Sequence, residues 1–214
     1  MNLRIAFITA LVALTSIVAS AQKNFEGTIV YDIEYLSVPA EVEGMESMLP
    51  SQMSMQFSGD WMRLEQEVMG GSQSVVVNSE EKISFILMDM MGQKIVMRIP
   101  KEQIEAQEAA TPEPEIFEER ERKEIAGYKC QKALIKQADG SKVEVFYTKD
   151  LGDIRHNEYK KLPGFPLQYV AEAQGMKTRI TASKVTPGKL SEDIFKVPDG
   201  YTEMSQEDMM RMGQ

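Results

Sequence analysis

The sequence predicts a mainly β protein built on one long, strongly curved antiparallel sheet. Apolar and polar residues alternate over many short segments. Turn signals containing Gly or Asp recur roughly every ten residues, which is typical of antiparallel strands joined by tight turns. A sheet of roughly ten strands must curl or close to bury its apolar face, so we expect a concave face that other segments cover.

The first predicted strand, 25–35, shows the alternation most clearly. Phe25 and Tyr31 share one of its faces, and charged residues dominate the other. Further strands follow in the same half of the chain. They cover residues 52–57, 61–69, 74–78, 82–88 and 94–99. At the start of the strand at 61–69, Trp61 lies on the face opposite Met62.

Two segments interrupt this pattern and are candidates for covering the concave face. Residues 38–50 form an acidic, Met-bearing stretch with two prolines, which we interpret as a short helix or flap between the first two strands. Residues 101–124 carry nine acidic and four basic side chains around two further prolines. This composition predicts a solvated helix or a mobile connector after Ile99, and a charged loop without function is the alternative to a lid.

The strand pattern resumes in the C-terminal half. The predicted strands are 128–136, 142–148, 167–173 and 176–185. Asp139-Gly140 is a hairpin turn signal between the first two of these strands. Ser191 is a predicted N-cap for a single helical turn at 192–195. From Thr202 the chain is polar and contains methionine, which indicates a tail that frays.

The N-terminus has the features of a cleavable export signal. Arg4 precedes an apolar stretch of 14 residues at 5–18, and small residues at 19–21 form the predicted cleavage site. The stretch is shorter than the ~20 residues that span a bilayer as a helix, so an uncleaved anchor is the less favoured alternative. We predict residues 1–21 to be a signal peptide, 22–201 a single β-rich domain and 202–214 a polar tail. The protein is then exported and periplasmic or extracellular.

The composition disfavours several classes of function. Removing Arg4 with the signal peptide leaves 23 basic against 33 acidic residues, a net charge of −10, which repels nucleic acid and anionic lipid surfaces. Cys130 is the single cysteine and lies in a strand-like run, so we predict a buried hydrophobe rather than a nucleophile. His156 is the single histidine and lies in a polar loop. We therefore expect no catalytic residues, no metal and no cofactor.

The C-terminal half also carries a series of short motifs. They are EIAGYKCQKA at 124–133, GSKVEVFYT at 140–148, LPGFPL at 162–167 and DIFKVPDGY at 193–201. In this order they resemble uncharacterised exported proteins of Bacteroidetes-type bacteria with domain of unknown function 4412. The shape of those proteins is similar to that of periplasmic lipoprotein carriers (LolA/LolB-like), a half-open β-barrel with short helices over its mouth. The resemblance implies a hydrophobic cavity and a lipid-like or lipoprotein ligand, and it transfers no active-site residue.

Methionine is unusually frequent, with 16 residues in the chain. The flexible thioether adapts to acyl chains and to varied partners, so methionines in or beside the segment at 38–50 are candidates for lining an apolar site. Trp61 is a candidate rim residue of the same site. The full set of candidates is Met45, Met48, Met53, Met55 and Trp61. Core filling is one alternative for the methionines, and Cu(I) binding by thioethers is another.

The sequence thus favours a non-catalytic binding protein of the cell envelope that holds a lipid or lipoprotein-like ligand on its concave face. Burial of apolar surface would supply most of the affinity. The alternative is a structural or protein-interaction module that docks another envelope protein without a small ligand. Neither hypothesis includes an enzyme, a nucleic-acid partner or a membrane-spanning segment after signal cleavage.

Overall fold

The structure is a computed structural model that describes residues 25–68, 70–110, 113–137, 140–152, 161–173, 175–205 and 208. The predicted signal peptide, His156 and most of the predicted C-terminal tail lie outside the described residues. Within them, no helix has both the length and the apolar character required to cross a membrane.

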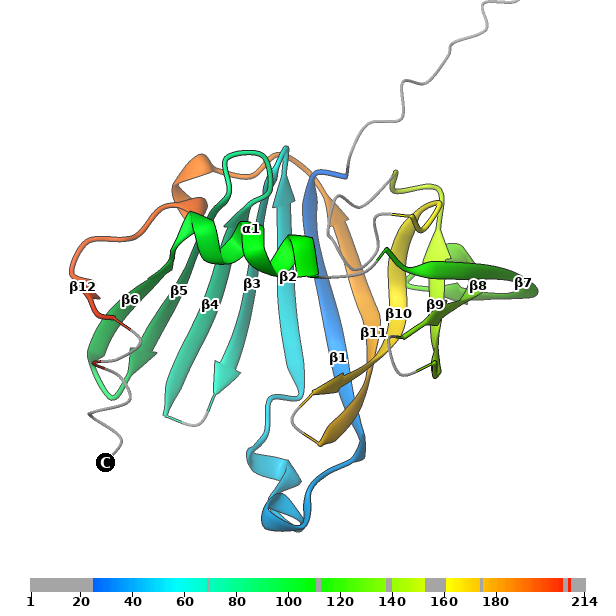
Figure 1. The fold of residues 1–214 in the computed structure, drawn as a ribbon, viewed down its shortest axis with the longest axis horizontal. Helices are drawn as coiled ribbons and strands as arrows, with labels where there is room; N and C mark the ends of the chain where they lie inside the picture. The colour runs from blue at the N-terminus through cyan, green and yellow to red at the C-terminus, as the bar shows by residue number, and fades with distance from the viewer. Residues whose placement is uncertain are drawn as a thin grey trace, which may run out of the picture.

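Within the described ranges, a single sheet of 12 strands confirms the predicted mainly β, curved and open fold (Figure 1). The strands are β1 (Gly27–Ser37), β2 (Gln52–Ser58), β3 (Trp61–Val68), β4 (Gly71–Asn78), β5 (Ile83–Met90), β6 (Gln93–Ile99), β7 (Glu115–Ile125), β8 (Tyr128–Lys136), β9 (Lys142–Thr148), β10 (Phe165–Ala173), β11 (Met176–Pro187) and β12 (Thr202–Glu203). The helical elements are α1 (Lys101–Ala110) and the 3-10 helices η1 (Ala40–Val42), η2 (Glu46–Met48) and η4 (Glu192–Phe195). Neighbouring strands are antiparallel, except that β12 runs parallel to β6.

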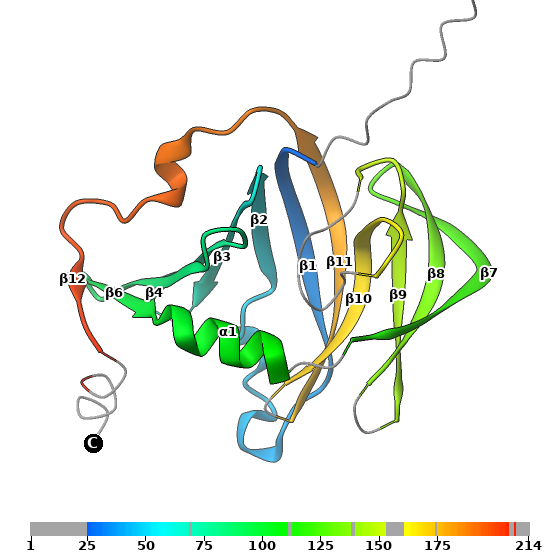
Figure 2. The same ribbon diagram turned by 45° about the horizontal axis from the view of Figure 1, so that its top comes forward.

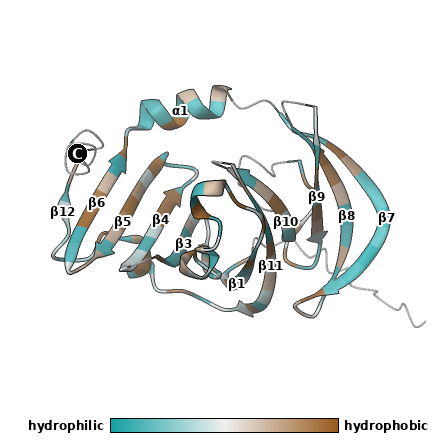
Figure 3. Cartoon of the chain, turned by 90° about the horizontal axis from the view of Figure 1, so that it is seen from below, coloured by the Kyte–Doolittle hydropathy of each residue, from teal (hydrophilic) through white to brown (hydrophobic). Residues whose placement is uncertain are grey.

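The strand order divides the sheet into two wings. Strand β1 lies between them and pairs with β2 on one side and with β11 on the other. Strands β2–β6 form one wing and β7–β11 form the other, each as a series of antiparallel neighbours. Successive strands twist by roughly 20° relative to one another, so a sheet of this length curls. Helix α1 carries the chain from β6 to the far edge at β7 and lies across the open side of the curl (Figure 3).

The charged segment after α1 corrects the sequence-based expectation. We expected a solvated helix or a connector at 101–124, with any helix ended by the prolines. Helix α1 does end at Ala110, but an edge strand, β7, occupies Glu115–Ile125. This strand pairs only with β8, and most of its side chains are exposed. Charged side chains on an edge strand hinder pairing with other chains. The charge density of this segment therefore fits an edge strand as well as a loop.

The main core lies inside the curl, where side chains of both wings meet. The rings of Phe25, Phe57 and Phe165 pack edge to face, with centroids 5.1 to 6.0 Å apart. Tyr31 of β1 is 1% exposed, and its hydroxyl donates to the carbonyl of Pro166 at 3.1 Å. Because Pro166 belongs to β10, this hydrogen bond links the central strand β1 to the wing formed by β7–β11, across β11.

The C-terminal arm, residues 188–203, covers the convex face of the wing formed by β2–β6, on the side of the sheet opposite α1 (Figure 2). Phe195 is 3% exposed and packs on Trp61 at a centroid distance of 5.8 Å. Arg63 donates to the carbonyl of Ile194 at 2.8 Å. Strand β12 then pairs with β6, so the first two residues of the predicted polar tail belong to the sheet.

Replacing Phe195 by alanine should lower the free energy of unfolding by about 3 kcal/mol, because the buried ring is lost and a cavity remains under the arm. Urea denaturation followed by the fluorescence of Trp61, the single tryptophan, measures the change. Glu192→Ala in the same 3-10 helix is the matched exposed control and should cost less than about 0.5 kcal/mol. Similar values for the two variants would mean that the arm does not pack on the sheet.

Candidate functional site

An apolar row crosses the concave face from β1 to β6. The register aligns one residue from each strand. These residues are Ile29, Met55, Leu64, Val75, Ile86 and Met97. Directly opposite side chains on one face of a sheet lie about 5 Å apart. The six side chains therefore form a continuous stripe, termed here the middle row.

Two further rows flank the middle row on the same face. One contains Phe57, Met62, Val77, Ser84 and Ile99. The other contains Tyr31, Met53, Gln66, Gln73, Met88 and Ile95. No side chain in the three rows carries a formal charge at neutral pH. Together the three rows are termed the concave apolar face.

Exposure changes along the concave apolar face. Near β1 it belongs to the main core, where Met53 is 6% and Met62 is 9% exposed. Over β4–β6 the middle row is only half-buried at Val75, Ile86 and Met97. Among the residues that alternate with these three on the convex face, four are buried in one cluster with the C-terminal arm: Val76, Phe85, Leu87 and Val96. The open side of this wing therefore presents apolar side chains that the described residues cover incompletely.

Helix α1 lies over this open side without burying any of its own residues. Ile104 is its one large apolar side chain. An ion pair fastens the helix to the turn between β4 and β5, where Lys82 Nζ donates to both carboxylate oxygens of Glu108 at 2.7 and 2.8 Å. Asn78 orders that turn, because its side-chain oxygen accepts from two backbone N–H groups of the turn. Helix α1, which covers the concave apolar face, is thus held by an ion pair to a turn that Asn78 orders.

The five candidate lining residues do not gather at one place. Met53 and Met55 lie on the concave apolar face. Met45 and Met48 are 45% and 46% exposed in the segment at 38–50, which forms η1 and η2 beyond the ends of β1 and β2 (Figure 1). Trp61 lies on the convex face, where it contacts the C-terminal arm. A site on the concave face would thus include two of the five.

The sequence patterns did not predict that β4–β6 contribute residues to the concave apolar face. Both faces of these strands carry large apolar side chains, so a period of two does not show which face a cover element buries. The alternation of Ile95, Met97 and Ile99 is the available signal. Only the register shows that Val75 and Ile86 continue the same row.

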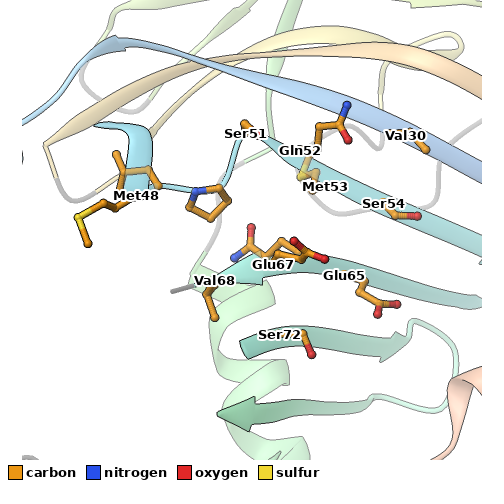
Figure 4. A pocket seen from close by; sticks show the side chains of 13 residues that line it. Val30, Met48, Ser51, Gln52, Met53, Ser54, Glu65, Glu67, Val68 and Ser72 are labelled. Atoms are coloured by element: carbon orange, nitrogen blue, oxygen red, sulfur yellow. The ribbon is translucent and has the colours of Figure 1, made fainter. Parts of the chain in front are cut away.

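A pocket of about 870 Å³ lies beside the segment at 38–50 (Figure 4). Its lining includes Met48, Leu49, Pro50, Gln52, Glu65 and Glu67. Gln52, Glu65 and Glu67 alternate with residues of the concave apolar face, so their side chains point to the convex face. The pocket is therefore lined mainly from the convex face, although Met53 and Gln66 of the concave apolar face also line it.

Cys130 is buried, as predicted for the single cysteine. Cys130 is 1% exposed and donates a weak hydrogen bond to the carbonyl of Tyr128 at 3.5 Å. Desolvation raises the pKa of the thiol to about 11, against a smaller lowering effect of the charge on Lys123. No group of three or more His, Cys, Asp or Glu side chains among the described residues is placed to hold a metal ion.

The fold and this face define an open, curved β-sheet protein whose concave side is apolar and partly covered. The chain belongs to the family described as Domain of unknown function (DUF4412), whose model matches residues 42–162. The matched region contains β2–β9 and α1, and hence most of the concave apolar face. No curated protein matches the sequence.

Three solved structures are similar to this chain at low sequence identity. The structure of PNGF-II is 16% identical with a TM-score of 0.50, and the alignment covers 86% of this chain and 32% of PNGF-II. This chain thus spans about a third of PNGF-II, and the likeness shows the fold alone. An uncharacterized conserved protein from Thermus thermophilus is 9% identical, with a TM-score of 0.48. The alignment covers 85% of this chain and 91% of the Thermus protein. MucB is 13% identical over 83% of this chain and 58% of its own, with a TM-score of 0.34.

Breaking the ion pair between Lys82 and Glu108 should loosen α1. Lys82→Met should speed amide hydrogen exchange in α1 by about two- to fivefold, as expected for loss of a partly exposed ion pair. Hydrogen-exchange mass spectrometry of peptides from α1 measures the rate. The charge exchange Lys82→Glu with Glu108→Lys is the control and should restore slow exchange. Unchanged exchange in Lys82→Met would show that other contacts hold the helix.

The thiol of Cys130 should react slowly in the native protein. A pKa raised from 9.0 to about 11 leaves about a hundredfold less thiolate near neutral pH, and burial restricts access further. Reaction with a thiol reagent at pH 8, followed by absorbance with and without 8 M urea, checks this. The unfolded protein serves as its own control. Equally fast reaction in both states would contradict a buried, protonated thiol.

Proposed function

We propose that this chain is a non-catalytic binding protein of the cell envelope, whose concave apolar face holds an acyl chain of a lipid or a lipoprotein. The observation that carries the proposal is the set of three uncharged rows over β1–β6, half-buried where the sheet opens. Two spacings between strands of ~4.8 Å separate Val75 from Met97, so the half-buried part of the middle row spans about 10 Å. A segment of an acyl chain fits along that length.

The energetics favour an apolar ligand over a charged one. Burying apolar surface contributes ~25 cal/mol per Å², from which the ordering of ligand and side chains must be subtracted. Methionines on the face, such as Met88 and Met97, adjust to ligands of different shape. The predicted net charge of −10 after export disfavours nucleic acid and anionic surfaces as partners. The predicted signal peptide is the basis for assigning the function to the cell envelope.

A protein partner is the second candidate. Met45 and Met48 are among the most exposed large apolar side chains of the described residues and lie together in the segment at 38–50. Apolar side chains clustered at an exposed turn are typical of contact surfaces. In this case the protein would dock another envelope protein and need no lipid.

Replacing Met97 by glutamine should weaken binding of a lipid to the concave apolar face by about fivefold, because a half-buried apolar side chain becomes polar. Native mass spectrometry with lipid extraction, on mature protein purified from the periplasm, identifies the bound species. Uptake of a fluorescent fatty acid then measures the affinity. Met91→Gln is the matched control, since Met91 is 91% exposed in the turn between β5 and β6.

The outcomes separate the two candidates. A co-purifying lipid that is lost in Met97→Gln and retained in Met91→Gln supports the acyl-binding function. Protein that arrives empty and takes up no hydrophobic probe would rule that function out. Crosslinking from the segment at 38–50 to a single envelope protein would then support the interaction module.

A further inference from the structure

The pocket on the convex face has one apolar wall. Met48, Leu49 and Pro50 form this wall where η2 leads into β2. Met48 is 46% exposed, and its flexible thioether adapts to whatever it contacts. The volume of about 870 Å³ falls within the range of small-molecule sites. The wall therefore offers contact area for an apolar group of ligand size.

The floor of the same pocket is acidic. Glu65 and Glu67 of β3 line it, and Figure 4 shows their side chains together with those of Gln52 and Ser72. Arg63 Nε lies 3.3 Å from Glu65 and balances that carboxylate. Glu67 forms no ion pair with a basic side chain in the part of the chain that the structure describes. One carboxylate of the pocket is thus available to a positive group.

Charges around the pocket add to this acidic character. Asp32 of β1 lies beside the pocket and accepts a hydrogen bond from Gln52 at 2.8 Å. Asp89 of β5 is the cross-strand partner of Ser72 and lies 4.0 Å from Lys94. Lys184 of β11 is the cross-strand partner of Val30, at the opposite margin of the pocket. Carboxylates therefore outnumber basic groups near the floor, which favours a cation there.

We propose that this pocket binds an organic cation with an apolar tail, with the positive group at Glu67 and the tail along Met48, Leu49 and Pro50. A long-chain alkylamine has this chemistry, and so does a lysine side chain within an apolar peptide. Both backbone edges of β2 and β3 are paired with neighbouring strands, so a peptide has no free edge to add to. The side chains of the pocket, rather than backbone hydrogen bonds, would therefore recognise the ligand.

The test uses dodecylamine, below its micelle concentration at pH 7, as the probe for the mature protein in isothermal titration calorimetry. Because the proposed site on the concave apolar face also accepts a dodecyl tail, the comparison is made in the Met97→Gln variant. In that variant dodecylamine should bind at least about tenfold more tightly than dodecanoate, which has the same tail and the opposite charge. Glu67→Gln should weaken dodecylamine binding by about three- to fivefold, the range of an exposed ion pair. Met48→Ser should weaken it by a similar factor through lost apolar contact.

Glu102→Gln is the matched control, because it changes the net charge equally and lies on α1, away from the pocket. This variant should bind dodecylamine as the unaltered protein does. Equal binding of dodecylamine and dodecanoate would overturn the inference, and so would equal losses in Glu67→Gln and Glu102→Gln. A short apolar peptide with one central lysine that binds through Glu67 would support the same pocket with a peptide as the source.

The pocket and the concave apolar face can be tested independently. Met97→Gln alters the concave apolar face and should leave the part of dodecylamine binding that depends on Glu67 unchanged. If Met97→Gln abolishes this binding while Glu67→Gln does not, the amine occupies the concave face and the inference is wrong. Failure of the concave face to take a lipid would not affect the expected result at Glu67.

Discussion

The pairing of β1 with β11 makes one sheet out of two wings that would otherwise be separate. The ladder runs from Gly27 opposite Pro187 to Ser37 opposite Lys177, between strands that lie far apart in the sequence. Each wing alone is an open meander with an apolar face and two edges, which is prone to association. The ladder joins both wings into one sheet of 12 strands and brings their apolar side chains together inside the curl.

The two faces of the β2–β6 wing are covered to different extents, and this difference creates the candidate site. The C-terminal arm buries the convex face with Phe195 as its anchor. On the concave face, α1 crosses at the open side, has no buried residue and is fastened through Glu108. Apolar side chains under a poorly packed cover are what an exchangeable apolar ligand requires. The C-terminal arm is thus a well-packed cover on the convex face, whereas α1 is a weakly packed cover on the concave face.

Several acidic residues form ion pairs on the surface of the wing formed by β7–β11. Lys132 of β8 lies 2.6 Å from Glu144 and 3.0 Å from Glu121, and these hydrogen bonds raise the pKa of its ammonium group. Edge strand β7 supplies Glu121, so ion pairs there reinforce the pairing of strands and keep the edge charged. Glu67, at the pocket beside η2, stands apart from this pattern.

Local sequence patterns were sufficient to predict most of the strands, the N-cap at Ser191 and the buried state of Cys130, and they gave a helix after Ile99 as one of two alternatives. These features follow from alternation, turn residues and composition. The same patterns did not reveal edge strand β7, because a segment with so many charged residues is typical of a loop. They also did not reveal that Val75, Ile86 and Met97 lie on one open face. Both emerge only in three dimensions, because strand order, register and the path of the C-terminal arm depend on contacts between residues far apart in the chain.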